Sequence, residues 1–475
     1  MRRAKIVCTL GPSAETLDQL RSIIAAGMDV ARLNLSHGSH QEHQARYDAV
    51  RQAADEVGKG VGIFVDLQGP KIRTGRFKNG KEALVQGQTF TITIDDIEGD
   101  NERCSTTFKG LPGDVKPGDM ILIDDGRISL QAVEVTKTDV ITTVVEAGVI
   151  SNNKGINLPG VAVSVPALSE KDIEDLRWGL RAGVDMIALS FVRDARDIED
   201  VHRIMDEEGI RLPVIAKIEK PQAVANLQEI VDAFDAIMVA RGDLGVELPL
   251  EEVPLVQKHC VALARAAGKP VIVATQMLDS MVSASRPTRA EASDVANAVL
   301  DGADALMLSG ETSVGDHPAL VVSTMARIIE HVEEEALERL PKVGESVGTS
   351  TARAVTAAAT LVGNAVDASH LVAFTESGLS ARLMARHRNR IPILAFTTHP
   401  RTRSQLSLVW GVETFIVNPV KHTDDMAAQV DKALIEIDRA SIGEKIVLVA
   451  GVPPGVPGTT NGMRVHIIGS NRQGI

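Results

Sequence analysis

Charged side chains stand at the ends of two apolar segments, residues 213–218 and 235–240, which predict consecutive buried strands joined by a helical pattern at 224–234. The first unit carries Lys217 and Glu219, and the second ends in Arg241, Gly242 and Asp243. Ligands bind at the carboxyl ends of strands in α/β proteins, where such groups have a use. The two carboxylates supply hard oxygen ligands for a divalent cation, and the lysine supplies a positive charge beside them.

A structural interpretation competes with this one. Lys217 and Glu219 would then be surface charges at a strand end, and Arg241 and Asp243 would form a local salt bridge. Either interpretation is reasonable for one segment alone. Because equivalent positions of two consecutive units carry such residues, the pattern favours a functional site.

Strands and helices alternate over most of the first 340 residues. The predicted strands are 5–10, 29–35, 61–65, 186–190, 213–218, 235–240, 270–274 and 305–308. Eight strands, each followed by a helix, are typical of a closed (β/α)₈ barrel. Polar groups at the strand ends would then converge on one face; besides those above they include Arg32, Asn34, Asp66, Ser190, Thr275, Ser309 and Glu311.

Two further units are predicted. Residues 71–166 show short alternating runs, Gly, Asp and Asn turns and no helix pattern, which indicates a small antiparallel β barrel or sandwich placed to act as a lid. An acidic run at 331–339 and the stretch from Pro341 to Gly348 indicate a domain boundary. The predicted domains are the barrel (1–70 and 167–340), the inserted lid (71–166) and a C-terminal α/β domain (341–475).

Composition limits the partners and the compartment. A formal net charge of −13 argues against a nucleic-acid or membrane-surface partner. The three cysteines form no pair at metal-ligand spacing and lie in or near apolar runs, which suits buried thiols in a reducing compartment. No secretory signal pattern or membrane-length apolar run is present, so we expect a cytoplasmic protein.

The sequence resembles the pyruvate kinase family in a series of motifs that spans nearly the whole chain. In order, they are KIVCTLGPS, ARLNLSHG, DLQGPKIRTG, NLPG, SEKD, IAKIEKPQAV, MVARGDLGVE, ATQMLDSM and MLSGETSVG. The resemblance implies transfer of a phosphoryl group from phosphoenolpyruvate to ADP, giving pyruvate and ATP in the last step of glycolysis. It also implies a homotetramer and a requirement for Mg²⁺, with Mn²⁺ as an alternative.

The resemblance also implies roles for individual residues. Glu219 and Asp243 would bind the divalent ion, and the catalytic residues would be Lys217, Arg32, Arg73 and Thr275. Lys217 would stabilise charge on the moving phosphoryl group, Arg32 and Arg73 would lie against phosphates, and Thr275 would hold the substrate carboxylate. Substrate binding would involve Arg32, Gly242, Asp243, Thr275, Ser309 and Glu311. Nucleotide binding would involve Asn34, His37, Arg73 and Lys154, and a K⁺ site would use Asn34, Ser36, Asp66 and the Leu67 carbonyl.

The chemistry agrees with this assignment, because phosphoryl transfer requires alignment and cations around developing charge. No Walker-type loop is present, since Gly58-Lys59 and Gly268-Lys269 are not followed by Ser or Thr. Nucleotide binding is therefore expected from the lid and the barrel face. The proton donor to the enolate stays open between Thr275, acting through water, and Lys217.

Two departures from the family pattern bear on regulation. Lys71 stands where many relatives carry Glu, and an ammonium near Asn34, Ser36 and Asp66 would replace bound K⁺, so we expect K⁺ to be dispensable. The loop Thr375, Ser377, Gly378 and Ser380 matches the one that binds an activator phosphate in sugar-phosphate-regulated relatives, but it contains Glu376. Like charges repel, so we expect a sugar monophosphate or AMP, rather than fructose 1,6-bisphosphate, as effector.

Two other functions compete. Another Mg²⁺–enolate barrel enzyme, such as an aldolase or a phosphoenolpyruvate mutase relative, would lack a lid with Arg73 and Lys154 and would need no ADP. A catalytically inactive, nucleotide-sensing paralogue would be expected to have lost Lys217, Glu219 or Asp243, and all three are present.

Overall fold

A closed barrel of eight parallel strands forms the centre of the computed structural model, which describes residues 2–161, 163–343, 350–420, 422–456 and 458–470. The barrel order is β1-β16-β15-β14-β13-β12-β3-β2. The strands are β1 (Lys5–Thr9), β2 (Val30–Asn34), β3 (Gly62–Asp66), β12 (Met186–Leu189), β13 (Val214–Ile218), β14 (Ala236–Ala240), β15 (Val271–Ala274) and β16 (Ala305–Leu308). The predicted (β/α)₈ barrel is therefore confirmed.

Helices surround this barrel, and local sequence sets where several of them begin. Capping boxes open α1, α2, α4 and α10, in each of which a Ser or Thr side chain accepts from the third helical amide. The helices are α1 (Leu17–Ala26), α2 (His40–Val57), α4 (Glu170–Ala182), α5 (Asp197–Glu208), α6 (Pro221–Ala225), α7 (Leu227–Ala233), α8 (Arg241–Glu247), α9 (Val253–Ala267), α10 (Arg289–Asp301), α11 (Gly310–Ser313) and α12 (Pro318–Ala336). The single helix expected at 224–234 is divided into α6 and α7 at Asn226, whose side chain donates to the Arg193 carbonyl.

The insertion after β3 is a curled β-sheet unit. Its strands are β4 (Lys81–Leu84), β5 (Thr89–Thr93), β6 (Arg103–Ser105), β7 (Met120–Ile123), β8 (Ile128–Val135), β9 (Asp139–Glu146), β10 (Gly148–Ser151) and β11 (Ile156–Asn157). Two details differ from expectation. A short helix, α3 (Leu111–Asp114), interrupts the strands, and β5 pairs with β6 in parallel.

The C-terminal unit is a five-stranded α/β sheet in the order β19-β18-β17-β20-β21. Its elements are α13 (Thr351–Ala365), β17 (His370–Phe374), α14 (Leu379–Ala385), β18 (Ile393–Thr397), α15 (Pro400–Leu406), β19 (Val412–Ile416), α16 (Thr423–Glu436), β20 (Lys445–Gly451) and β21 (Thr460–Ile467). Most of the boundary stretch expected from Pro341 to Gly348 lies outside the described residues.

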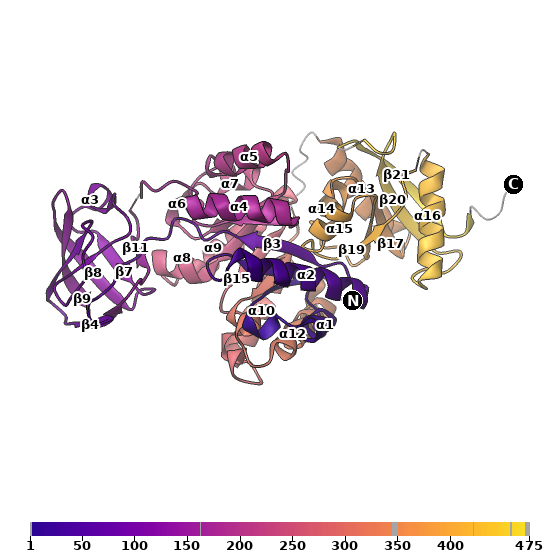
Figure 1. Cartoon of the computed structure of the whole chain (residues 1–475). Helices are drawn as coiled ribbons and strands as arrows, with labels where there is room; N and C mark the ends of the chain where they lie inside the picture. Colours follow the sequence, from indigo (N-terminus) through magenta and orange to yellow (C-terminus); the bar gives the residue numbers. More distant parts are fainter. Residues whose placement is uncertain (1, 162, 344–349, 421, 457, 471–475) are drawn as a thin grey trace.

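The three units follow one another along the molecule, with the inserted sheet and the C-terminal unit on opposite sides of the barrel (Figure 1). The C-terminal unit reaches into the barrel: Leu408 belongs to the same buried cluster as Val7, Phe64 and Met238 of the barrel interior. Beside it, the Trp410 amide donates to Asp304, which immediately precedes β16. The C-terminal unit therefore closes the end of the barrel at which the strands begin.

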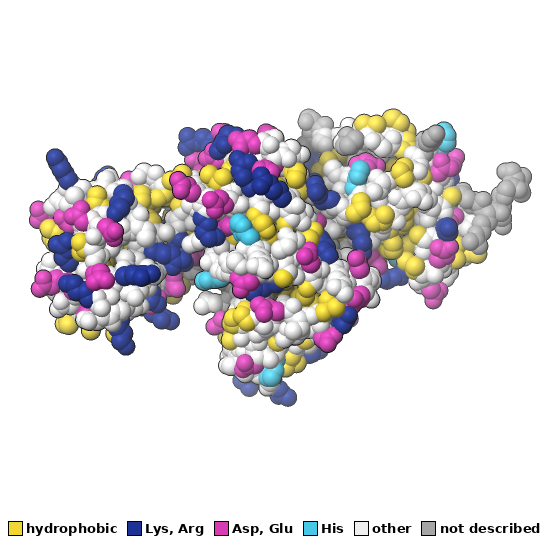
Figure 2. Space-filling model, viewed as in Figure 1, with side chains coloured by type: hydrophobic (Ala, Val, Ile, Leu, Met, Phe, Trp, Pro, Cys, Tyr) yellow, Lys and Arg dark blue, Asp and Glu magenta, His cyan; other side chains and the backbone are white. Residues whose placement is uncertain are grey.

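Surface charge is mixed in sign. On the face shown in Figure 2, Lys and Arg side chains are interspersed with Asp and Glu over all three units. The three cysteines are free and buried. No helix among the described residues is long and apolar enough to cross a membrane.

Candidate functional site

A buried carboxylate, Asp66, lies at the centre of the charged groups on the carboxyl side of the barrel. It ends β3 and is 1% exposed. Its Oδ2 accepts from Arg32 Nε of β2 at 2.7 Å, and its Oδ1 lies 3.2 Å from Lys217 Nζ of β13. Three strands thus place two cations on one carboxylate, as expected from the polar strand ends.

Lys217 has further partners. Its Nζ lies 2.9 Å from Glu219 Oε1 and donates to Ser190 Oγ at 2.7 Å. Ser190 in turn donates to the Leu67 carbonyl at 2.7 Å. The alternative in which Lys217 and Glu219 are surface charges is therefore wrong, because both are buried.

Electrostatics keeps these groups ionised. Burial alone would lower the pKa of Lys217, but the charges of Asp66 and Glu219 outweigh it and raise the pKa. Burial would raise the pKa of Asp66, but Lys217 and Arg32 lower it. A permanent positive charge is therefore held at the barrel face.

Glu219 and Asp243 fit a divalent cation site. Glu219 Oε2 accepts from the Phe191 amide at 2.7 Å, which orients the carboxylate. Burial raises the pKa of Glu219, and the charge of Lys217 lowers it in part. The neighbouring charge of Asp243 raises the pKa of Glu219 further, and a bound cation would relieve this repulsion between the two carboxylates. Among the described residues, no group of three or more His, Cys, Asp or Glu side chains is placed to hold a metal ion.

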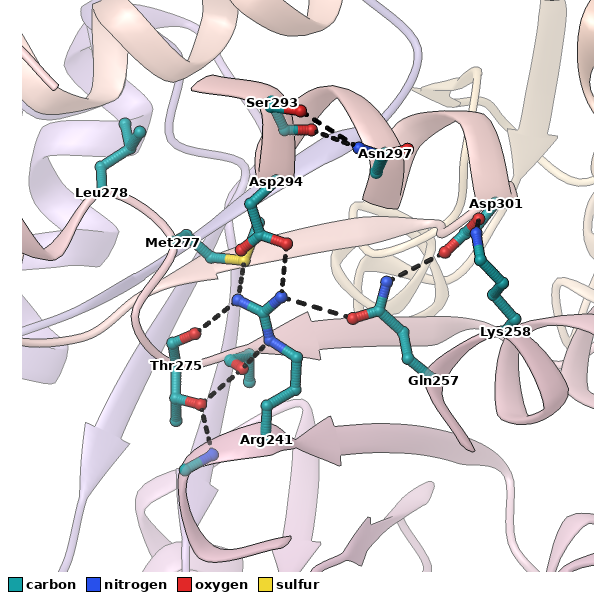
Figure 3. Close-up of polar contacts among 12 residues, drawn as sticks. Arg241, Gln257, Lys258, Thr275, Met277, Leu278, Ser293, Asp294, Asn297 and Asp301 are labelled. Carbon is teal, nitrogen blue, oxygen red and sulfur yellow. Dashed lines mark hydrogen bonds and ion pairs between the residues drawn. The ribbon is translucent and has the colours of Figure 1, made fainter. Parts of the chain in front are cut away.

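Arg241 braces the loop that carries Thr275 (Figure 3). Its guanidinium donates to the carbonyls of Ala274 and Thr275 at 3.3 and 2.7 Å, and to Asp294 of α10 at 2.7 Å. The expected alternative of a local pair with Asp243 is therefore wrong. Thr275 and Gln276 have φ values of +70° and +53°, a conformation that costs non-glycine residues about 1–3 kcal/mol each. Thr275 Oγ1 accepts from the Gly242 amide at 2.8 Å.

Ser309 and Glu311 lie beneath the same face, after β16. Glu311 is 1% exposed and accepts from the amides of Ser309 and Leu278 at 2.7 and 3.1 Å. It thereby ties the loop after β15 to the loop after β16. The Ser309 hydroxyl is buried and has no partner among the described residues.

The residues of the expected K⁺ site are only partly brought together. Asn34 Oδ1 accepts from the Ser36 amide at 3.2 Å, and Asp66 lies on the adjacent strand in register with Asn34. His37 is exposed. Lys71 is also exposed, with its terminal atoms beside Gly155 of the insertion, and no hydrogen bond or ion pair among the described residues joins it to this site.

Arg73 and Lys154 belong to the insertion and contact other parts of it. Arg73 donates to the Asn153 carbonyl at 3.1 Å, and Lys154 pairs with Asp124 at 2.8 Å. Among the described residues, neither side chain bonds to the barrel. The structure therefore does not bring these two residues to Lys217.

A polar link joins the insertion to the barrel, and no sequence pattern predicts it. Glu247, at the end of α8, is 5% exposed; it pairs with Lys220 and accepts from Asn157 of β11 at 3.0 Å. Lys220 follows Glu219, and Asn157 lies where the chain leaves the insertion. Glu247 and the NLPG motif, which begins at Asn157, can both be found in the sequence, but their spacing does not indicate that they are in contact.

The loop expected to bind an effector borders a separate cavity of about 290 Å³ in the C-terminal unit. Thr375 Oγ1 accepts from the Gly378 amide, and Ser380 bonds to Thr460, so both hydroxyls are engaged. Glu376 lies 2.7 Å from His399 Nε2. The described lining residues include no Lys or Arg.

The fold and these groups define a (β/α)₈-barrel enzyme whose cation-rich site suits the handling of phosphate. Residues 1–322 match the family model "Pyruvate kinase, barrel domain" and residues 353–466 match "Pyruvate kinase, alpha/beta domain". The chain is 56% identical to pyruvate kinases of Corynebacterium glutamicum, over 99% of this chain and 98% of the relative, and Mycobacterium tuberculosis, over 99% of both. A crystal structure of a pyruvate kinase from Cryptosporidium parvum matches with a TM-score of 0.92 and 36% identity, covering 98% of this chain and 96% of that one.

The chain therefore belongs to the pyruvate kinase family and is an enzyme with that activity, the transfer of a phosphoryl group from phosphoenolpyruvate to ADP. The aldolase and mutase alternatives are set aside by this result.

We expect Arg241→Met to lower kcat/KM for phosphoenolpyruvate by about 10–100-fold while KM for ADP changes little, because the Thr275 loop loses its donors. Steady-state kinetics with each substrate varied would measure this. Arg196→Met is the matched control, since that side chain is 81% exposed and, among the described residues, bonds only to Asp194. Equal kinetics for the two variants would contradict the bracing role.

Proposed function

We propose that the transfer takes place at the carboxyl end of the barrel, with Lys217 and Arg32 as the cations that stabilise charge on the moving phosphoryl group. The observation that carries this proposal is the buried Lys217 ammonium, held between Asp66, Glu219 and Ser190. Such a preorganised charge stabilises developing negative charge without reorganisation. The P–O bond of phosphoenolpyruvate breaks as a bond to the terminal oxygen of ADP forms, and the enolate then gains a proton at carbon.

The substrate carboxylate would lie against the Gly242 and Asp243 amides and Thr275. Thr275 Oγ1 now accepts from the Gly242 amide and donates to the Ala274 carbonyl, so bound substrate would take over the amide and would compete with that carbonyl for the hydroxyl proton. Ser309, whose buried hydroxyl lacks a partner among the described residues, would complete the floor with Glu311. Thr275, through water, and Lys217 stay the two candidates for the proton donor.

Glu219 and Asp243 would hold Mg²⁺, or Mn²⁺ in its place. When bound, this ion would supply positive charge that offsets the negative charge developing on the substrate. The protein residues orient these two carboxylates: the Phe191 amide fixes Glu219, and the first turn of α8 carries Asp243.

The nucleotide would bind between barrel and lid. Arg73 and Lys154 are carried by the insertion, so closure of that unit would bring them to Asn34 and His37 on the barrel. Closure would also exclude water from the phosphoryl group. A cytoplasmic homotetramer is the assembly and location that we propose from family membership.

We expect Lys217→Met to lower kcat by about 10²–10³-fold or more, because one fixed cation is lost from the transition state. The assay couples pyruvate to lactate dehydrogenase in the presence of phosphoenolpyruvate, ADP and Mg²⁺. Lys432→Met, at a 74% exposed position, is the control. Absence of ADP-dependent pyruvate formation by folded wild-type protein, even with sugar phosphates and AMP, would favour the sensing paralogue.

We propose that K⁺ is dispensable, because two cations already lie on Asp66 and because Lys71, now exposed beside Gly155, would move towards this site when the insertion closes on the barrel. In sodium-free Tris, replacing tetramethylammonium chloride with KCl should change the rate little. Lys71→Glu should make the rate rise with K⁺. A large K⁺ stimulation of wild-type enzyme would refute the proposal.

We propose a sugar monophosphate or AMP as effector, because a bisphosphate in the C-terminal cavity would meet Glu376 and no Lys or Arg among the described lining residues. Micromolar fructose 1,6-bisphosphate should activate poorly, and Glu376→Gln should improve its response. Glu338→Gln, at a 79% exposed position, should leave the response unchanged. Strong activation of the wild type by this bisphosphate would contradict the proposal.

A further inference from the structure

A narrow cleft between the barrel and the C-terminal unit is lined by an unusual excess of positive charge. It lies between the carboxyl end of α9, in the barrel, and α14, in the C-terminal unit. The only carboxylate among its described lining residues is Asp304, which pairs with Arg388 at 2.9 Å and accepts from two backbone amides. The cations that line the cleft are Arg265, Lys269, Arg382, Arg386 and Arg388.

Groups just outside the cleft do not remove this excess. Arg353 adds a further cation, since it and Arg386 both donate to the Ala266 carbonyl, at 2.8 and 3.0 Å. Asp235 and Asp232 contribute negative charge towards Lys269, whose ammonium donates to the Asp232 and Phe234 carbonyls. His387 is neutral near pH 7, because burial and the charge of Arg386 lower its pKa to about 4. Six cations therefore face three carboxylates.

A structural role explains part of this cluster. Arg353 and Arg386 satisfy carbonyls at the carboxyl end of α9, where the helix dipole favours cations. Carbonyl oxygens take up hydrogen bonds but carry no net charge, so the charge of these side chains stays uncompensated. Arg265 also lies in the last turn of α9, but its guanidinium bonds to the Arg386 carbonyl of the C-terminal unit and to no carbonyl of α9 among the described residues.

Arg265 is the least satisfied of these cations. Its side chain is 3% exposed, its Nη2 makes one long hydrogen bond of 3.3 Å to the Arg386 carbonyl, and its Nε has no partner among the described residues. Burial, followed by the neighbouring charge of Arg388, lowers its pKa to about 9. Arg388 Nε is a second buried donor without a partner in the described part of the chain. Donors of this kind are costly to bury unless an acceptor reaches them.

We propose that this cleft binds a phosphate-class oxyanion, either free phosphate or the phosphate group of a monoester. Guanidinium groups bind such oxyanions through forked hydrogen bonds. As the side chains stand, the cleft has room for about one water-sized group. Lys269 and Arg382 are only half-buried, so entry of the anion requires these two side chains to swing outward.

The anion would join two units of the protein. Arg265 and Lys269 belong to the barrel, whereas Arg382, Arg386 and Arg388 belong to the C-terminal unit. Like charges on the two sides repel, and an anion between them converts this repulsion into attraction. Binding should therefore stabilise the docking of the C-terminal unit on the barrel.

The test compares melting temperatures of the full chain in potassium phosphate and in potassium gluconate at equal ionic strength. We expect phosphate to raise the wild-type Tm by about 2–4 °C more than that of Arg265→Met. Phosphate bound at the active site or the effector cavity contributes equally to both proteins. In gluconate, Arg265→Met should be as stable as wild type or more so, because an uncompensated buried charge is gone.

Two outcomes would overturn the proposal. A structural arginine predicts that Arg265→Met lowers the Tm by the same amount in both salts. If phosphate binds only at other sites, phosphate should raise the Tm of Arg265→Met as much as that of wild type. If Arg265→Met does not fold, Lys269→Met decides, with Arg390→Met at a 64% exposed position as the control.

A second arm distinguishes the two sources of phosphate. AMP and adenosine are added to wild type and Arg265→Met in gluconate. A rise in Tm that AMP causes, that adenosine does not cause and that Arg265→Met abolishes would assign a phosphate monoester. A rise in Tm that only inorganic phosphate causes and that Arg265→Met abolishes would assign the free anion. If neither AMP nor inorganic phosphate raises the Tm of wild type more than that of Arg265→Met, the site is refuted. Because the readout is Tm, it does not depend on catalytic turnover or on the roles proposed for the active site.

Discussion

The ion pairs of Asp66 with Arg32 and Lys217 are the interactions on which the rest of the site depends. Each partner comes from a different strand, and parallel register places Asp66 opposite Asn34 on one side and Ala188 on the other. Removing one partner of a buried ion pair typically costs about 3–5 kcal/mol. Assembly of the site therefore depends on closure of the barrel, because Asp66 meets Arg32 and Lys217 only when β2, β3 and β13 lie in register.

Much of this arrangement can be predicted from sequence, for a physical reason. Strands of a parallel barrel are buried on both faces, so a Lys or Asp at their ends stands out against Val and Ile. This contrast is enough to indicate Lys217, Asp66 and Arg32 as candidate site residues. Comparable contrast identifies the insertion, in which alternating runs replace helix patterns. Site roles still rest on proposal, because position at a strand end does not specify which group binds which ligand.

Other features are beyond the reach of sequence patterns. Arg241 bonds to Asp294, 53 residues later, and no local pattern indicates that partner. Phe191 donates its backbone amide to Glu219, and the type of a residue does not reveal a contact made by its backbone. The sequence predicts Lys71 near Asp66, yet its side chain follows the chain into the insertion and lies beside Gly155. Its neighbours depend on the angle between two units, which is set by contacts far apart in sequence.

One such contact set connects the insertion to the two carboxylates that we propose as metal ligands. Asn157 donates to Glu247, Glu247 pairs with Lys220, and Lys220 adjoins Glu219 in the chain. Glu247 also ends the short helix whose first turn carries Asp243. A displacement of the insertion that breaks the Asn157 bond would leave a buried carboxylate with one partner fewer, which is costly. The lid angle and the position of both carboxylates are therefore energetically linked.

One end of the barrel contacts the C-terminal unit, the other end carries the candidate site, and β16 connects the two. Before the strand, Asp304 accepts from Trp410 and pairs with Arg388, both in the C-terminal unit. After the strand, Ser309 and Glu311 form the floor of the candidate site. β16 has only four residues, all of them buried, so close packing opposes bending of the strand. Asp304, beside the cationic cleft, and Ser309, beside the candidate site, are thus joined by one short strand that the barrel core holds in place.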